Sequence, residues 1–154
     1  MLLDTNVVSE LRRGRRCATA VAAWQATVCL WDQYLSVITL LELRRGIALK
    51  ARTDPVAGAR LLAWYQQKLK PTYVSRLLPV TPCIAERCAG LHVPDSRAYR
   101  DSLIAATALE HGLTVVTRNV RDFDGIDELV VVNPWQYLPP DNVSTGAYPL
   151  PLSG

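Results

Sequence analysis

The sequence has no long hydrophobic run, and none of its apolar stretches approaches the roughly 20 residues of a membrane-spanning helix. It also lacks the order of a secretory leader. Such a leader begins with basic residues, whereas here an acid, Asp4, comes first and the basic residues follow. We therefore expect no membrane partner and a cytoplasmic location.

Sulfur and imidazole ligands are scarce as well. The chain has two histidines and four cysteines, with no CxxC pair and no histidine at zinc-finger distance from a cysteine. This pattern argues against a structural zinc site. We expect reduced, mostly buried thiols at Cys17, Cys29, Cys83 and Cys88.

The sequence has no large excess of one charge. Its 17 basic and 14 acidic residues leave a net charge of +3, which is too small to indicate nucleic-acid binding by itself. The basic residues instead form local clusters, and a single cluster is more often a solvated helix face than a binding site. The clusters are Arg12, Arg13, Arg15 and Arg16, and Arg44, Arg45, Lys50 and Arg52.

A chain of 154 residues, 49% hydrophobic and 20% charged, has the size and composition of one globular domain. No internal repeat occurs within residues 1–138, and from residue 139 the composition changes to Pro, Asn, Ser and Gly. We predict one domain over 1–138, followed by a flexible tail or docking arm over 139–154.

Short apolar strand patterns alternate with helical patterns along the chain. Pro71 predicts the end of the fourth helix, Pro79 places the third strand at a sheet edge, and Gly112 ends the last helix. This alternation predicts an α/β fold, a three-layer α/β/α sandwich around a mostly parallel sheet. The predicted strands cover about 2–3, 34–37, 77–80, 113–117 and 129–132, and the helices about 7–12, 18–28, 39–51, 55–70, 84–91 and 97–111.

Four acidic residues fall where this fold brings side chains together. Asp4 follows the first strand, and Asp122 lies shortly after a later strand. Asp101 and Glu42 lie near the starts of two helices. Strand carboxyl ends and helix amino ends share one rim of an open parallel sheet, which is where such folds bind ligands. The pattern therefore predicts that all four acids meet in one site.

Each acid also has a structural interpretation, and for a single acid that interpretation is the more frequent one. Asp4 could cap a helix, and Asp122 could form an Asx turn. Asp101 could stabilise a helix start, and Glu42 could pair with Arg45. None of these roles explains why all four acids fall on one rim.

Several carboxylates at one rim repel each other, and burial raises their pKa values further. A divalent cation relieves that repulsion. Because the ligand candidates are all oxygen atoms, Mg²⁺ or Mn²⁺ is favoured over zinc. A carboxylate-held ion of this kind binds phosphate oxygens and activates water, which is the chemistry of phosphodiester hydrolysis.

The acids lie within four short segments that read LDTNVVSE over 3–10, SVITLLEL over 36–43, DSLIAATA over 101–108 and TRNVRDF over 117–123. In this order and spacing they resemble the motifs of PIN-domain nucleases, especially the VapC-type and FitB-like toxins. The resemblance spans about residues 1–135. One such motif alone is weak, whereas four in the right order are specific.

The resemblance implies an endoribonuclease that depends on Mg²⁺ or Mn²⁺ and acts as the toxin of a toxin–antitoxin pair. It also implies a homodimer and a small VapB-like antitoxin that covers the acidic groove, with promoter DNA bound only through the antitoxin complex. The family's catalytic and metal-binding positions match Asp4, Glu42, Asp101 and Asp122, and its supporting polar positions match Asn6, Thr117 and Asn119.

The basic clusters gain a second interpretation from this resemblance. RNA carries phosphate charge, which an acidic rim repels unless cations compensate. Arginines on helices that start near the rim are placed to do so. We predict contacts to RNA or to the antitoxin from Arg12, Arg13, Arg44, Arg45 and Arg118.

Other protein classes also carry acids at strand ends. A receiver domain needs an acidic pair after its first strand, and a haloacid-dehalogenase-like phosphatase needs Asp-x-Asp, but Thr5 and Asn6 follow Asp4. Two alternatives stay open: a PIN fold that binds RNA or a partner without cutting, and a structure-directed DNA nuclease. The second is expected to carry long insertions, for which this chain has little room.

Overall fold

The computed structural model describes residues 1–94 and 96–139, and within them the sheet has five short parallel strands. They are β1 (Leu2–Leu3), β2 (Leu35–Ser36), β3 (Leu77–Leu78), β4 (Val115–Val116) and β5 (Val131–Val132). β4 lies between β1 and β5, β2 pairs with β3, and a bridge from Leu2 to Tyr34 joins the two groups. The strand order is therefore β3-β2-β1-β4-β5, with β3 at an edge as Pro79 predicts.

Helices connect these strands close to the predicted positions. They are α1 (Thr5–Leu11), α2 (Thr19–Thr27), α3 (Val37–Thr53), α4 (Pro55–Trp64), the π-helical turn η3 (Tyr65–Leu69), α5 (Lys70–Tyr73), α6 (Pro82–Gly90) and α7 (Tyr99–Glu110). Short 3₁₀ turns complete the chain: η1 (Gly14–Arg16), η2 (Leu30–Asp32), η4 (Val120–Phe123) and η5 (Pro134–Gln136).

The last long helix ends at Gly112, as predicted. Gly112 adopts a positive φ of 60°, and its N–H donates to the carbonyl of Leu109 at 3.3 Å. The N–H of Leu113 donates to the carbonyl of Ala108 at 2.8 Å. These two bonds form a Schellman motif, which ends α7 and directs the chain into β4.

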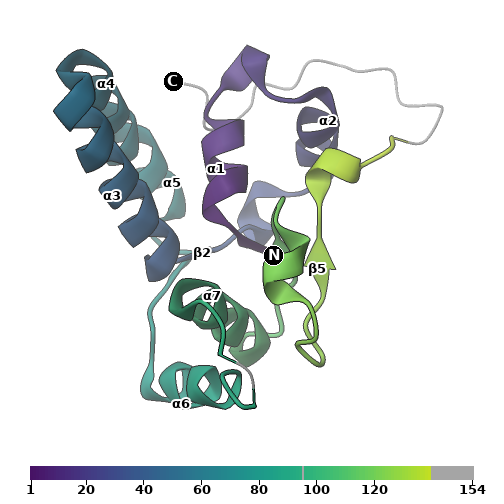
Figure 1. Cartoon of the computed structure of the whole chain (residues 1–154). Helices are drawn as coiled ribbons and strands as arrows, with labels where there is room; N and C mark the ends of the chain where they lie inside the picture. Colours follow the sequence, from purple (N-terminus) through teal and green to yellow (C-terminus); the bar gives the residue numbers. More distant parts are fainter. Residues whose placement is uncertain (95, 140–154) are drawn as a thin grey trace.

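Helices cover both faces of the sheet, and adjacent strand residues supply the two cores. Successive side chains in a strand point to opposite faces. Leu3 and Val116 pack with residues of α1, α2, α3 and α4, whereas Leu2 and Val115 pack with residues of α7. Figure 1 shows α1 and α2 above the sheet, and α6 and α7 below it. The three-layer α/β/α sandwich predicted from the sequence is confirmed.

The prediction that the fourth helix stops before Pro71 is wrong. The chain passes from α4 through the wide turn η3 into α5, which contains Pro71. In η3 the N–H of Lys70 donates to the carbonyl of Tyr65, five residues earlier. A widened turn relieves the clash between a proline ring and the preceding turn. Helix continuation buries Tyr73, whose hydroxyl donates to Gln33 at 3.2 Å.

α3 and α4 form a tightly packed helical hairpin. Asp54 ends α3 and caps α4, accepting a hydrogen bond from the N–H of Ala57 at 2.9 Å. Pro55 follows at the first helical position, where its missing N–H has no cost. A Cβ added to Gly58 would lie 2.5 Å from the Cα of Ala51. The hairpin therefore depends on a glycine at position 58.

The cysteine prediction is partly wrong. All four thiols are free, but Cys29 and Cys83 are exposed, because they lie before a surface 3₁₀ turn and on the outer side of α6. In the part of the chain that the structure describes, no helix is both long and apolar enough to span a membrane. Residues 140–154 of the predicted tail lie outside the described residues, so the division at residue 138 stays a prediction.

Candidate active site

The structure places the four predicted acids at the same rim of the sheet. Asp4 directly follows β1 and caps α1, where it accepts a hydrogen bond from the N–H of Thr5 at 2.6 Å. Asp101 lies in the first turn of α7, and Asp122 lies in η4, which follows β4. Glu42 lies in the second turn of α3, because that helix begins earlier than predicted.

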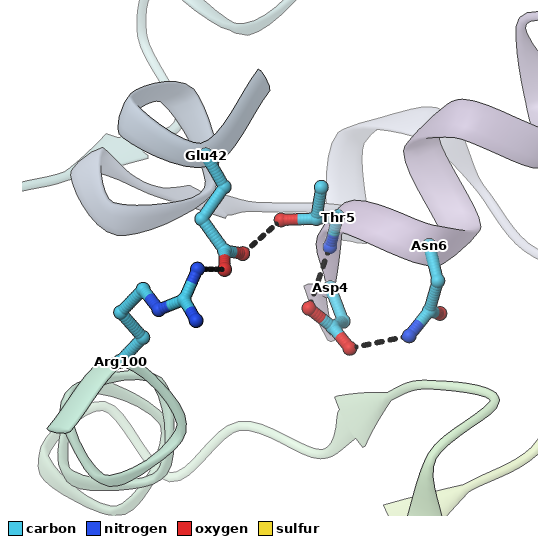
Figure 2. A network of polar contacts seen from close by, with 5 residues as sticks. All are labelled: Asp4, Thr5, Asn6, Glu42 and Arg100. Carbon is cyan, nitrogen blue, oxygen red and sulfur yellow. Dashed lines mark hydrogen bonds and ion pairs between the residues drawn. The ribbon is translucent and has the colours of Figure 1, made fainter. Parts of the chain in front are cut away.

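Asp4 is buried and held by side chains from two further elements. Its Oδ2 accepts hydrogen bonds from Nδ2 of Asn6 and from Oγ1 of Thr117, each at 2.6 Å (Figure 2 shows the Asn6 contact). The Thr117 oxygen in turn accepts the backbone N–H of Asn119 at 3.0 Å. Asn6 and Thr117 therefore orient the Asp4 carboxylate, and the backbone N–H of Asn119 holds Thr117.

Glu42 is held from both sides. The Thr5 hydroxyl donates to its Oε2, and the guanidinium of Arg100 forms an ion pair with its Oε1 at 2.9 Å (Figure 2). The Glu42 side chain is only 17% exposed, compared with 53% for Arg100. Within the described residues Glu42 forms no ion pair with Arg45, so that structural alternative is wrong.

Burial and mutual repulsion act on these acids. Burial raises the pKa of Asp4, with the charge of Glu42 adding to the effect and the hydrogen bond from Thr117 opposing it. Burial also raises the pKa of Asp101 to about 6, and the charges of Asp122, Asp4 and Glu42 add to that rise. The charge of each of the other three carboxylates therefore acts on Asp101.

The donor set suits a hydrated divalent ion better than a closed metal cage. Among residues 1–94 and 96–139, no three His, Cys, Asp or Glu side chains are grouped closely enough to hold an ion by themselves. Mg²⁺, however, usually keeps several waters and takes only one or two protein carboxylates. Burial raises the pKa of Asp101 and the neighbouring carboxylates add to that rise, so a cation at this rim would relieve the added repulsion. The residues fit such an ion, and their role as ligands stays a prediction.

Sequence comparison relates this geometry to known proteins. A family model described as PIN domain matches residues 1–129. The chain belongs to the PIN-domain family.

Two relatives match this PIN domain over most of their length. Toxin FitB of Neisseria gonorrhoeae is 38% identical over 142 residues, which cover 88% of this chain and 98% of FitB. VapC ribonuclease Y4jK of Sinorhizobium fredii is 33% identical over 147 residues, which cover 88% of this chain and 98% of Y4jK.

Solved structures share the fold. FitAcB from Neisseria gonorrhoeae matches with a TM-score of 0.79 at 37% identity, covering 88% of this chain and 98% of the other. A toxin–antitoxin complex from Klebsiella pneumoniae matches with a TM-score of 0.58 at 30% identity, covering 86% of this chain and 96% of the other. These likenesses agree with the sandwich described above.

The five arginines predicted to contact RNA or antitoxin lie in different surroundings. The guanidiniums of Arg12, Arg44 and Arg118 lie 5.4 to 5.7 Å from the ring centroids of Trp64, Tyr65 and Trp135, respectively. Arg13 is paired with Glu10 at 3.0 Å, and Arg45 is exposed on α3. Their contacts to RNA or antitoxin remain predictions.

The sequence-based prediction missed two residues of the PIN-domain site, Thr5 and Arg100. Both stand next to a predicted acid in sequence, Thr5 beside Asp4 and Arg100 beside Asp101. Each nevertheless bonds to Glu42, which belongs to a different helix. Adjacency to an acid was the only signal available, because the contact itself depends on how the helices face one another.

Proposed function

We propose that this PIN domain is a VapC-type endoribonuclease, which hydrolyses RNA phosphodiester bonds with Mg²⁺ or Mn²⁺. The observation that carries the proposal is the convergence of four carboxylates at one rim, where three of them help to raise the pKa of Asp101. The relative Y4jK, which is named a VapC ribonuclease, supports RNA as the substrate.

A divalent ion at this rim supplies Lewis acidity and an activated water for attack on phosphorus. The chain's own residues would fix where such an ion is held. Asn6 and Thr117 orient the carboxylate of Asp4, and Thr5 holds that of Glu42. Asp101 and Asp122 reach the same rim from α7 and η4, where they would bind the ion directly or through its bound waters.

The proposal extends to the partners of the chain and to its cellular location. FitB is named a toxin, and the Klebsiella structure is described as a toxin–antitoxin complex. We therefore propose that this chain is the toxin of a pair, silenced by a small VapB-like antitoxin over the acidic groove. A homodimer, promoter DNA bound through the antitoxin, and action on RNA in the cytoplasm belong to the same proposal.

RNA cleavage by the purified chain tests the catalytic part. Wild-type protein should cut single-stranded RNA in Mg²⁺ or Mn²⁺ and lose that activity in EDTA. Asp4→Asn should be inactive, because it removes a ligand charge and keeps a good helix cap. Glu86→Gln, which neutralises an exposed acid on α6, serves as the matched control and should cut like wild type.

Three results would contradict this function. Asp4→Asn cutting RNA at the wild-type rate would overturn the site assignment. Binding of RNA by wild type without cleavage in either metal would favour a non-cleaving PIN module. Cleavage confined to structured DNA would favour the DNA-nuclease alternative.

A further inference from the structure

A cavity of about 180 Å³ adjoins the acidic site between α1, α3 and α4. Thr5 and Glu42 belong to its wall, so the cavity is continuous with the acid rim. Ser9 and Arg12 line it from α1, and its apolar wall is formed by Leu43, Ile47, Leu61 and Trp64. We refer to this space as the Arg12 cavity.

Arg12 is a half-buried cation in this wall, and within the described residues it has no acidic partner. Its guanidinium lies 5.7 Å from the ring centroid of Trp64. Burial and the charges of Arg16 and Arg13 lower the pKa of Arg12. Arg13, by contrast, has its own partner in Glu10. A partly desolvated guanidinium plane without a counter-ion suits an anionic or π-rich ligand.

The cavity is open because position 46 has no side chain. Gly46 lies in the middle of α3, where glycine is less favourable for a helix than alanine. A Cβ added to Gly46 would meet nothing within 4 Å. Side chains in a helix tilt toward its amino end, so one at position 46 would extend toward Glu42, one turn earlier.

We propose that the Arg12 cavity is a nucleobase subsite, which takes one unpaired base of the RNA strand beside the scissile phosphate. The base would stack on the guanidinium of Arg12, which lies 5.7 Å from the ring centroid of Trp64, and its edge would meet the Ser9 hydroxyl. Unstacked RNA bases are recognised by stacking on arginine planes and by hydrogen bonds to their edges.

This inference rests on the proposed ribonuclease function and adds a determinant of its specificity. Under this proposal, Arg12 selects the base next to the cut and is more than one member of a basic cluster. The continuity of the Arg12 cavity with Glu42 favours a part of the substrate over a distant partner segment.

Gly46→Leu tests the subsite because it adds a side chain to the wall of the cavity and removes none. The probe is a pool of single-stranded RNA octamers of random sequence, cut in Mg²⁺ and sequenced at the cleavage points. Wild type should show a base preference at one position beside the cut. Gly46→Leu and Arg12→Ala should flatten that preference and lower kcat/KM about tenfold, the effect of losing one stacked base.

Matched variants separate the subsite from nonspecific effects. Gly46→Ala leaves most of the cavity open, Gly90→Leu adds the same side chain at another open glycine, and Arg15→Ala removes a nearby exposed charge. All three should keep the wild-type preference. A substitution that displaced the Glu42 side chain would instead slow the cleavage of every RNA sequence equally. Melting temperatures check that each variant folds.

An unchanged preference and rate in Gly46→Leu would overturn the subsite. If wild type cuts no RNA, the proposed function fails. The affinity for the same octamer pool, measured by fluorescence anisotropy in EDTA, then tests the subsite independently of cleavage. About tenfold weaker binding by Gly46→Leu than by Gly46→Ala would support the subsite. Equal affinities would overturn it.

Discussion

At the scale of single residues, Asp4 serves two purposes with one carboxylate. One oxygen caps α1 through the N–H of Thr5, and the other accepts hydrogen bonds from Asn6 and Thr117. These bonds favour the ionised form, whereas burial favours the protonated form, and burial dominates because the pKa is raised. The carboxylate is therefore held in one orientation at a rim where a cation would stabilise it.

Asp101→Asn should stabilise the metal-free protein at neutral pH. The pKa of Asp101 is raised from 3.8 to about 6, so folding becomes less favourable as pH rises through that interval. Because Asp101 is partly exposed, solvent screening limits the gain in unfolding free energy to about 1 kcal/mol, or roughly 3 °C in Tm. Calorimetry in EDTA should show this gain above pH 6 and its disappearance near pH 4. A gain that is the same at both pH values would contradict the raised pKa of Asp101.

Arg100→Ala should strengthen metal binding. Arg100 neutralises Glu42 in the metal-free chain and competes with an added cation for the same carboxylate. Its removal should raise the affinity for Mn²⁺ by roughly fivefold, the effect of about 1 kcal/mol between charges in water. Arg45→Ala, which removes an equal charge from the surface of α3, is the control and should change the affinity less. Electron paramagnetic resonance of free Mn²⁺ measures both, and an equal response would argue against direct competition.

The rim position of the acids could be predicted from the sequence because it follows from local order. Asp4 follows a strand and Asp101 lies at the start of a helix, regardless of how the rest of the chain folds. The partners of Glu42 could not be predicted in the same way. Thr5 and Arg100 reach it across two helix interfaces, and the local alternative, Arg45, lies in the same helix.

At the scale of elements, the α3–α4 hairpin carries both Glu42 and the apolar wall of the Arg12 cavity. Its close approach depends on Gly58, which faces Ala51 of α3. The hairpin therefore links a packing requirement far from the acids to the position of one of them.

Gly58→Ala should destabilise the protein although alanine is the better helix former. The added Cβ would lie 2.5 Å from Ala51 and force the two helices apart. Overpacking of this kind costs about 1–3 kcal/mol of unfolding free energy, more than the roughly 1 kcal/mol that helix propensity returns. Urea denaturation measures the difference. Gly90→Ala, where the added Cβ meets nothing within 4 Å, should be neutral or slightly stabilising.

Local sequence signals located most elements but failed at Pro71. A proline normally ends a helix, and that rule considers only the chain next to it. Here the wide turn η3 accommodates the ring, and the buried Tyr73 stabilises the continuation. The local rule was correct at Gly112, because the positive φ of this residue ends α7 by itself.

At the scale of the whole molecule, the alternation of strands and helices predicts the three-layer class but not the strand order. β1 pairs with β4, which lies more than a hundred residues later, and this pairing leaves no local trace. The same pairing brings Thr117 to Asp4 and places η4 beside α7. The acids of the site can be recognised from local sequence, but the long-range strand pairing brings them together.

Titration of the purified chain with Mn²⁺ by calorimetry tests the central claim, that the four acids form one divalent-metal site. Wild type and Glu86→Gln should bind Mn²⁺ with the same affinity. Asp4→Asn and Asp101→Asn should each bind at least about tenfold more weakly, because each loses a ligand charge at the rim. Equal Mn²⁺ affinity in wild type and in both Asn variants, with all proteins folded, would contradict the account.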